Sequence, residues 1–218
     1  MRAVLWDLDG TLADSEEYHW LSWRDTLVPE GIEITYDQFL ASFGQKNDRI
    51  LTEWLGKGAT PERIRRLGDA KELEYRRLAK ERGLTPLPGA AEWIQQLKRA
   101  GWKQAIASSA PRENVEVMLA ALGLATFFDA VITAEDVTAG KPDPQVFRAA
   151  AFRVHVPPSH CIVVEDAAAG IEAARRAGMR CIGVSRTTRL DADVFVSSLD
   201  ELLPTAFDAL LVRPIVSR

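Results

Sequence analysis

The stretch Ala3-Val-Leu-Trp-Asp7-Leu-Asp9-Gly-Thr-Leu12 lies near the start of the chain and decides its fold. Its four leading apolar residues predict a short strand covered on both faces, as in a parallel sheet. Asp7 and Asp9 follow two residues apart, so both side chains project to the same side while the backbone stays extended. We therefore expect a buried first strand with two carboxylates at its carboxyl end.

Further short apolar runs along the chain show the same continuous pattern. They alternate with helical patterns, three of which end just before a glycine, where a left-handed cap is favoured. Strands and helices that alternate with short connections predict an α/β core with a doubly wound, Rossmann-like parallel sheet. The later strands are expected at 104–107, 130–133, 161–164, 181–184 and 194–196, and the core helices at 90–100, 112–122, 144–154 and 167–177.

Residues 15–83 interrupt this alternation. They contain no convincing strand run, and they carry Trp20, Trp23 and Trp54 among helical stretches. Thr60-Pro61 predicts the start of a long charged helix that ends near Gly83, because both residue types are favoured at a helix N-terminus. We expect an α/β core of residues 1–14 and 84–218 and a small all-helical unit of residues 15–83, with a hinge at each junction.

Composition limits the partners and the location. The 218 residues are 47% hydrophobic and 27% charged, with a formal net charge of −4. An acidic chain without a basic stripe is a poor candidate for nucleic-acid binding, and no window approaches the roughly 18 uninterrupted apolar residues of a membrane span. Cys161 and Cys181 lie within apolar runs, which predicts reduced core thiols and a cytoplasmic location.

A second acidic pair, Glu165-Asp166, follows the apolar run at 161–164. Each pair has an ordinary explanation, because Asp-x-Asp-Gly is a common turn and Asp166 could cap the next helix. The carboxyl ends of parallel strands meet at one edge of the sheet, however, where ligands bind. Acids gathered there form the oxygen-rich cluster that Mg²⁺ prefers, and without a cation they would repel one another. The expected metal-binding residues are Asp7, Asp9, Glu165 and Asp166.

Two further motifs have both a structural and a functional explanation. Ser108 and Ser109 end a predicted strand just before a helix, where they could cap the helix or bind a phosphate together with its free N–H groups. Lys141 precedes Pro142-Asp-Pro144. It could be a solvated side chain, or a cation that the prolines hold in one position.

Together, in this order, the motifs resemble the haloacid dehalogenase superfamily of Mg²⁺-dependent phosphohydrolases. The order is Asp-x-Asp-Gly-Thr after the first strand, Ser after the second, Lys before Pro-x-Pro, and Glu-Asp after a later strand. The resemblance covers nearly the whole chain, and the helical insertion is similar to the superfamily's cap. Leu12-Ala-Asp-Ser-Glu-Glu-Tyr-His19 is similar to the β-phosphoglucomutase-like branch, which also contains sugar-phosphate phosphatases.

This resemblance implies a role for each motif. Asp7 would attack phosphorus to form an aspartyl-phosphate, and Asp9 would act as general acid and base. Asp7, the Asp9 backbone carbonyl and Asp166 would hold Mg²⁺, with Glu165 nearby or bound through water. The residues expected to bind the substrate are Ser108, Ser109, Lys141, His19 and Lys71. The last two would belong to the cap, although a structural histidine and a solvated lysine would fit those positions equally well.

The loop Gly44-Gln-Lys46-Asn47-Asp-Arg49 departs from the mutase pattern. Where β-phosphoglucomutase has an arginine for the distal phosphate, this chain has Asn47, so a mutase would need Lys46 or Arg49 to supply the charge. We therefore expect a Mg²⁺-dependent phosphatase that acts on a small phosphorylated metabolite, such as a sugar or polyol phosphate, and is a monomer or a weak homo-oligomer. A phosphomutase is the alternative. A non-catalytic phospho-acceptor module is a more distant one, because it needs neither Asp9 nor an enclosing cap.

Overall fold

A six-stranded parallel sheet forms the centre of the protein, in a computed structural model that describes residues 1–212. The strand order is β3-β2-β1-β4-β5-β6, so the first strand lies in the middle and the chain winds outward from it in both directions. This order confirms the predicted doubly wound fold. The strands are β1 (Ala3–Trp6), β2 (Lys103–Ala107), β3 (Ala130–Ile132), β4 (Cys161–Glu165), β5 (Arg180–Val184) and β6 (Val194–Val196).

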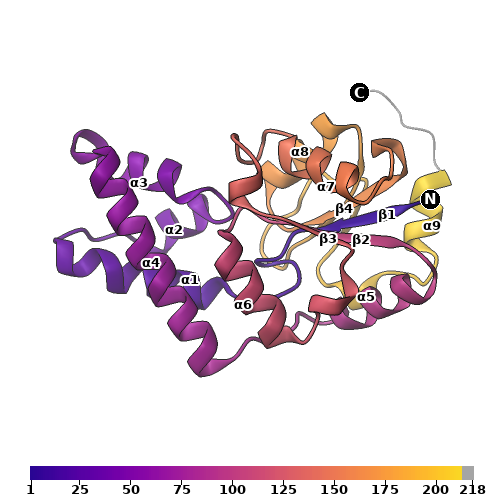
Figure 1. Ribbon diagram of the computed structural model, residues 1–218, viewed down its shortest axis with the longest axis horizontal. Helices are drawn as coiled ribbons and strands as arrows, with labels where there is room; N and C mark the ends of the chain where they lie inside the picture. Colours follow the sequence, from indigo (N-terminus) through magenta and orange to yellow (C-terminus); the bar gives the residue numbers. More distant parts are fainter. Residues whose placement is uncertain (213–218) are drawn as a thin grey trace.

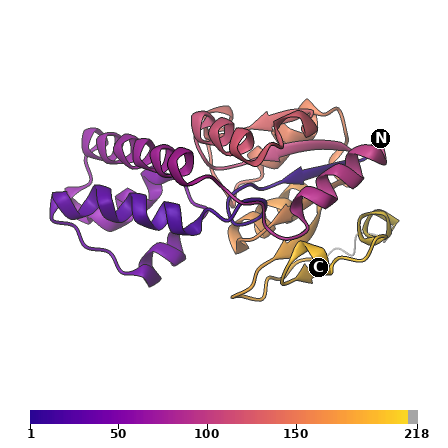
Figure 2. The ribbon, with the colours of Figure 1, turned by 90° about the horizontal axis from the view of Figure 1, so that it is seen from below.

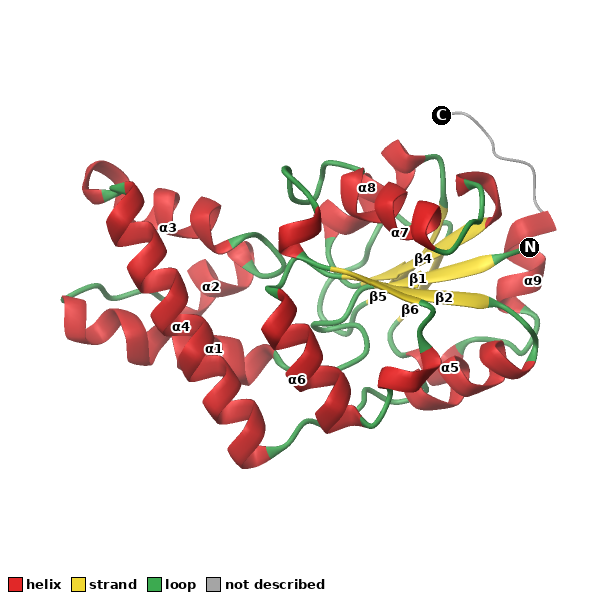
Figure 3. Ribbon diagram, viewed as in Figure 1, coloured by secondary structure: helices red, strands yellow, loops and turns green. Residues whose placement is uncertain are grey.

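Helices cover both faces of this sheet (Figures 1 and 3). Along β1, Val4 and Trp6 pack into the apolar cluster on one face, and Ala3 and Leu5 pack into the cluster on the other. All four side chains are fully buried, as a strand between two helical layers requires. One face is covered by α5 (Ala90–Arg99), α6 (Arg112–Leu122) and α9 (Ala206–Val212), and the other by α7 (Gln145–Arg153) and α8 (Ala168–Ala177).

Most predicted elements form with small shifts at their ends. The strand β4 runs one residue further than expected and includes Glu165. Asp166 does not cap α8, because the N-cap residue is Ala167 and no side chain bonds to the helix start. The short helix α9 was not expected, since its seven residues carry too few turns to show a helical period. The residues 213–218 of the expected core lie outside the described part of the chain.

Four helices between β1 and α5 form a separate group beside the carboxyl ends of the strands (Figure 2). Their apolar side chains make a cluster of their own, which includes Trp23, Phe39 and Leu51. The longest helix also contacts α6 of the core. The all-helical character expected of this segment is present, while the domain boundaries at 14/15 and 83/84 stay a prediction. The helices are α1 (Glu16–Leu27), α2 (Tyr36–Ser42), α3 (Asn47–Leu55) and α4 (Pro61–Arg82).

Two other expectations concern burial and hydropathy. Cys161 and Cys181 are buried free thiols, as predicted. Among residues 1–212, none of the helices combines the length and the apolar character needed to cross a membrane.

Candidate active site

The two acidic pairs meet where β1 and β4 end. These strands are neighbours, with Trp6 opposite Val164, and the Asp7 N–H donates to the Val164 carbonyl over 3.0 Å. One carboxylate oxygen from each of Asp7, Glu165 and Asp166 lies within 4.8 Å of the others. Since the strand order reverses beside β1, the acids lie in the crevice where doubly wound sheets bind ligands. We call these three residues the strand-end acids.

Two glycines make room for the strand-end acids. Gly10 has a φ of +73°, and a Cβ there would lie 2.1 Å from Asp166 Oδ2. A Cβ on Gly170, in the first turn of α8, would lie 1.7 Å from Glu165 Oε1. Any other residue at either position would push a carboxylate out of the group, so the sequence reserves space for the acids through these glycines.

Lys141 supplies the cation of this group. Its buried Nζ donates to Asp7 Oδ1 and, over 3.3 Å, to Glu165 Oε1. Burial alone would lower the pKa of Lys141, but the charges of Asp7 and Glu165 raise it above its ordinary value. The lysine therefore stays protonated, and the structural alternative of a solvated side chain is wrong.

One lysine does not neutralise the strand-end acids. Burial raises the pKa of Asp7 above its ordinary value even against the charge of Lys141. Burial and the charge of Asp7 raise the pKa of Glu165 to about 8, and burial with the charge of Glu165 raises that of Asp166 well above its usual range. A cluster of hard oxygen donors that is short of positive charge fits Mg²⁺. These residues can therefore hold the metal ion that the sequence predicts.

Asp9 follows β1 as well, but its carboxylate has different partners. Oδ1 accepts hydrogen bonds from Ser15 Oγ over 2.7 Å and from His19 Nε2 over 2.8 Å. Burial alone would raise the pKa of Asp9, yet His19, Ser15 and Lys71 together lower it below its ordinary value. Both hydrogen bonds reach Oδ1, and the Tyr75 hydroxyl also lies near this carboxylate. Asp9 lines the cavity described below, so its other oxygen can face a ligand there.

The orientation of His19 follows from its second partner. Lys71 Nζ lies 2.8 Å from His19 Nδ1, and an ammonium group has only donors to offer. Nδ1 must therefore accept, so the hydrogen of a neutral imidazole sits on Nε2 and points at Asp9 Oδ1. Both cap residues proposed from the sequence are buried and belong to this chain of contacts.

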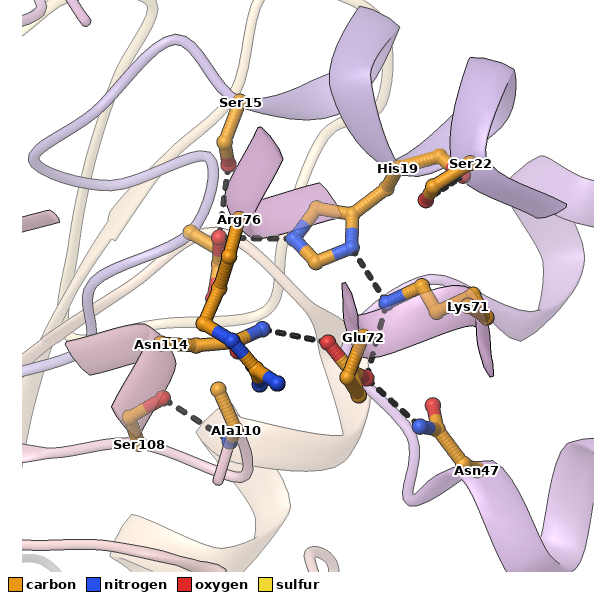
Figure 4. Close-up of polar contacts among 11 residues, drawn as sticks. Ser15, His19, Ser22, Asn47, Lys71, Glu72, Arg76, Ser108, Ala110 and Asn114 are labelled. Carbon is orange, nitrogen blue, oxygen red and sulfur yellow. Dashed lines mark hydrogen bonds and ion pairs between the residues drawn. The ribbon is translucent and has the colours of Figure 1, made fainter. Parts of the chain in front are cut away.

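The chain of contacts continues from Lys71 to the core (Figure 4). Glu72 Oε1 accepts from Lys71 Nζ over 2.9 Å and from Asn47 Nδ2 over 2.5 Å. Its other oxygen accepts from Asn114 in the first turn of α6. Asn114 in turn accepts from Arg76 over 2.9 Å. The long helix α4 is therefore tied to α6 through a buried carboxylate. We call Glu72 and its four neighbours, Lys71, Asn47, Asn114 and Arg76, the Glu72 network.

A cavity of about 230 Å³ lies between the helical group and the core. It is smaller than the roughly 300–1,000 Å³ typical of sites for drug-sized ligands, so it suits a small metabolite. Ser108 and Ser109 line it at the end of β2, together with Asp7 and Asp9. Ser108 Oγ accepts from the Ala110 N–H over 3.0 Å, while the N-cap residue of α6 is Pro111, so neither serine is the helix cap.

Three residues of the site were missed from the sequence. Ser15 looked like a boundary residue, although a serine and a histidine four residues apart share one face of a helix, and this spacing could have indicated it. Glu72 and Asn114 gave no such signal. Glu72 lies in a long charged helix whose polar residues are expected to face water, and Asn114 is a common residue in a first helical turn.

Comparisons with known proteins agree with this geometry. The haloacid dehalogenase-like hydrolase family matches residues 4–184. The chain is 33% identical to β-phosphoglucomutase of Bacillus subtilis (strain 168), with 93% of this chain and 92% of that protein covered. It is 34% identical to validoxylamine A 7′-phosphate phosphatase of Streptomyces hygroscopicus subsp. limoneus, with 92% and 95% covered. It is 38% identical to the chloroplastic protein SUPPRESSOR OF QUENCHING 1 of Arabidopsis thaliana, where 85% of this chain matches only 18% of that longer protein.

A solved structure extends the agreement to the fold. β-Phosphoglucomutase from Clostridium difficile superposes with a TM-score of 0.88 at 28% identity, covering 98% of this chain and all (100%) of that chain. Since the family is one of enzymes, the distant alternative of a non-catalytic phospho-acceptor module is wrong. The chain belongs to the haloacid dehalogenase-like hydrolase family, among its phosphatases and phosphomutases.

Proposed function

We propose that this protein is a Mg²⁺-dependent phosphatase that hydrolyses a sugar or polyol phosphate through an aspartyl-phosphate on Asp7. The observation that carries the proposal is the juxtaposition at the end of β1. A buried aspartate beside Lys141 and two further acids lies two residues before a second aspartate that is held by Ser15 and His19. The first carboxylate can attack phosphorus, and the second can move a proton.

In the first step, a carboxylate oxygen of Asp7 attacks the phosphorus of the ester. Lys141 and Ser108 bind the phosphoryl oxygens and stabilise the charge that builds up on them. The bond from phosphorus to the ester oxygen breaks, and that oxygen takes the proton from Oδ2 of Asp9 in its protonated form, which leaves Asp9 ionised. The hydrogen bond from His19 Nε2 to Asp9 Oδ1 fixes the orientation of this carboxylate.

In the second step, water attacks the phosphorus of the aspartyl-phosphate. Asp9, which the first step has left ionised and whose partners favour that form, takes the proton from this water and can donate it in the next turnover. Phosphate leaves and Asp7 is regenerated. Both steps use the same oxygen of Asp9, the one that does not accept the hydrogen bonds from Ser15 and His19.

The metal ion would be held by Asp7, Asp166 and the backbone carbonyl of Asp9, with Glu165 beside it. Bound Mg²⁺ would supply charge neutralisation for the phosphoryl oxygens and for the strand-end acids. Lys141 supplies part of that neutralisation in any case, because it donates to both Asp7 and Glu165.

The helical group would serve as a cap. We propose that residues 15–83 move against the core at the two junctions, admit the substrate and then exclude water during ester cleavage. Contacts between α4 and α6, and from Lys46 to the core, support a closed arrangement. His19 and Lys71 would then reach Asp9 only when the cap is closed, so acid-base chemistry would depend on an enclosed substrate.

Hydrolysis is favoured over phosphoryl transfer between sugars by the state of the cations near the cavity. Lys46 Nζ donates to the backbone carbonyls of Ala134 and Val137, 3.1 and 3.2 Å away. Arg49 is exposed and is not one of the residues that line the cavity, and Asn47 donates to Glu72. A mutase must hold a second phosphate, and of the two cations that could replace the missing arginine, one is already bonded to carbonyls of the core and the other lies outside the cavity lining.

A direct assay tests this function. The protein is incubated with Mg²⁺ and a panel of phosphate monoesters that includes β-glucose 1-phosphate, and inorganic phosphate and glucose 6-phosphate are measured separately. We expect inorganic phosphate from at least one sugar or polyol phosphate. Glucose 6-phosphate without inorganic phosphate would assign a mutase instead, and no product from any ester would contradict both activities.

A further inference from the structure

Glu72 is a buried acid in the cap half of the cavity, apart from the strand-end acids. Its side chain lines the same cavity as Asp7 and Asp9 and is 8% exposed. Burial alone would raise the pKa of Glu72, but Lys71, His19 and the hydrogen bond from Asn47 lower it below its ordinary value. Glu72 is therefore ionised near neutral pH, and its carboxylate lies in the cavity wall as the ion-pair partner of Lys71.

The cations of the cavity wall already have partners within the protein. Lys71 is paired with Glu72 and bonded to His19. Lys46 uses two of its N–H donors on backbone carbonyls of the core. Among the described residues that line the cavity, every lysine or arginine already has a hydrogen bond or an ion pair with another part of the protein. A second phosphate or a carboxylate in this half of the cavity would therefore have to compete with Glu72 for Lys71.

The polar atoms that remain suit hydroxyl groups. Gln45 lines the cavity, and its Nε2 donates to the Ala41 carbonyl, which leaves its buried Oε1 without a hydrogen-bond donor among residues 1–212. An acceptor of this kind can take the hydrogen of a hydroxyl but not an anionic oxygen. Two independent features, an ionised carboxylate and an unpartnered acceptor, thus favour the same kind of ligand.

We propose that Glu72 selects substrates whose leaving group is an uncharged polyol or sugar, and that it rejects monoesters carrying a second phosphate or a carboxylate. This inference rests on the proposed phosphatase function and names the substrate class of that site. The selection is electrostatic, because like charges in a poorly solvated cavity repel strongly. Asn47 and Asn114 hold the carboxylate in place, where it keeps Lys71 as its ion-pair partner.

A purely mechanical role for Glu72 makes a different prediction. Glu72 also joins α4 to α6 through Asn114, so its removal could loosen the closed cap. Loosening would weaken turnover of every substrate by a similar factor, because all of them need the same closed site. A change in the ratio of kcat/KM between uncharged and charged substrates is therefore the result that separates substrate selection from a role in holding the cap closed.

The experiment uses the Mg²⁺-loaded protein and matched substrate pairs. The kcat/KM is measured for fructose 1-phosphate against fructose 1,6-bisphosphate, for glucose 6-phosphate against glucose 1,6-bisphosphate, and for glycerol phosphate against phosphoglycerate. Wherever the uncharged member is a substrate, we expect its charged partner to be at least about tenfold poorer. In Glu72→Gln, this ratio should fall by about tenfold. Glu74→Gln is the matched control, since it removes the same charge from the same helix at a site paired with Arg77, and its ratio should stay within about twofold of the wild type.

A second variant guards against loss of folding. Asn47→Lys adds a cation beside Glu72 at the start of α3, where the side chain is only partly buried. Like Glu72→Gln, it should lower the ratio of kcat/KM between the uncharged substrate and its charged partner. Equal kcat/KM values for both members of every pair in the wild type would overturn the selection, whatever the variants do. A kcat/KM ratio that stays unchanged in both Glu72→Gln and Asn47→Lys would overturn it as well. Absence of hydrolysis of all monoesters would instead contradict the proposed function itself.

Discussion

The protein contains two buried polar clusters that lie within one site and differ in their charge balance. The strand-end acids, Asp7, Glu165 and Asp166, share the single cation Lys141, and all three have raised pKa values. In the second cluster Asp9 and Glu72 have one described cation, Lys71, and several neutral hydrogen-bond donors that include His19, and both acids have lowered pKa values. The first cluster is thus short of positive charge, whereas the second is already satisfied by the protein.

This difference indicates how the two clusters divide the work. A buried group of acids without enough cations is costly unless something positive arrives, so it is suited to bind a metal ion and to work on a phosphate. A satisfied network costs little to keep in one geometry, so it is suited to orient Asp9 and to shape the cavity. Each of the following changes should therefore affect one cluster in a way that the other does not share.

The largest effect is expected for Asp7→Asn. An amide is a very poor nucleophile, so kcat should fall by about 10⁴-fold or more. Steady-state phosphate release is the measurement, and a circular dichroism spectrum like that of the wild type shows that the variant is folded. Turnover that survives this change would assign the nucleophile to another residue.

A smaller loss is expected in the satisfied cluster. Asp9→Asn should lower kcat by about 10²- to 10⁴-fold, the usual range for loss of general acid-base catalysis. His19→Ala leaves the Asp9 carboxylate in place but removes the hydrogen bond that orients it, which should lower kcat by about 10²-fold. Because His19 lowers the pKa of Asp9, its loss should also move the alkaline limb of the pH–kcat/KM profile, where Asp9 loses the proton that it must donate, to higher pH. A profile that keeps its position would show that His19 does not act through Asp9.

Mg²⁺ should stabilise the protein through the strand-end acids alone. At a concentration of a hundred times its Kd, the ion should raise the free energy of unfolding by about 2.7 kcal/mol. Asp166→Asn should abolish this increase, and Glu72→Gln should keep it. Thermal unfolding with and without EDTA measures both effects. Equal stabilisation of wild type and Asp166→Asn would place the ion elsewhere.

The smallest effect is a pH dependence of opposite sign in the two clusters. The folded pKa of Glu165 is about 8 against an ordinary 4.5, so between these values the metal-free folded state binds more protons than the unfolded state and loses stability as the pH rises. The lowered pKa values of Asp9 and Glu72 act the other way. The stability that these two acids contribute is present when the pH is above their ordinary pKa values. It is lost as the pH falls through their lower pKa values in the folded state. Urea unfolding of the EDTA-treated protein should therefore show the neutral-pH loss, and Glu165→Gln should reduce it.

The sequence predicted the first cluster much better than the second. Asp7, Asp9, Glu165 and Asp166 follow apolar runs that can only be buried strands, and the ends of parallel strands meet by geometry. The fold and the gathering of Asp7, Glu165 and Asp166 could therefore be read from local patterns, whereas Lys141 was expected beside them only from the family resemblance. The strand-end glycines, Gly10 and Gly170, have no meaning until a carboxylate is seen against them.

The Glu72 network could not be read in this way. Asn47, Glu72 and Asn114 come from three helices, and their contacts depend on how the helical group sits on the core rather than on any local period. A charged residue in a long polar helix is ordinarily solvated, and only tertiary packing buries this one. Sequence patterns indicate which polar residues lie at the end of a strand, but they do not indicate which face of a helix packs against another part of the protein.

The most direct test of the account is to find the phosphoryl group on Asp7. The protein is mixed with Mg²⁺ and an ester that it hydrolyses, quenched in acid within one turnover, digested and examined by mass spectrometry. We predict one phosphoryl group on the peptide that contains Asp7 and none on the same peptide of Asp7→Asn. Hydrolysis with no phosphorylated peptide at any time after mixing, or with the phosphoryl group on another residue, would contradict the central claim.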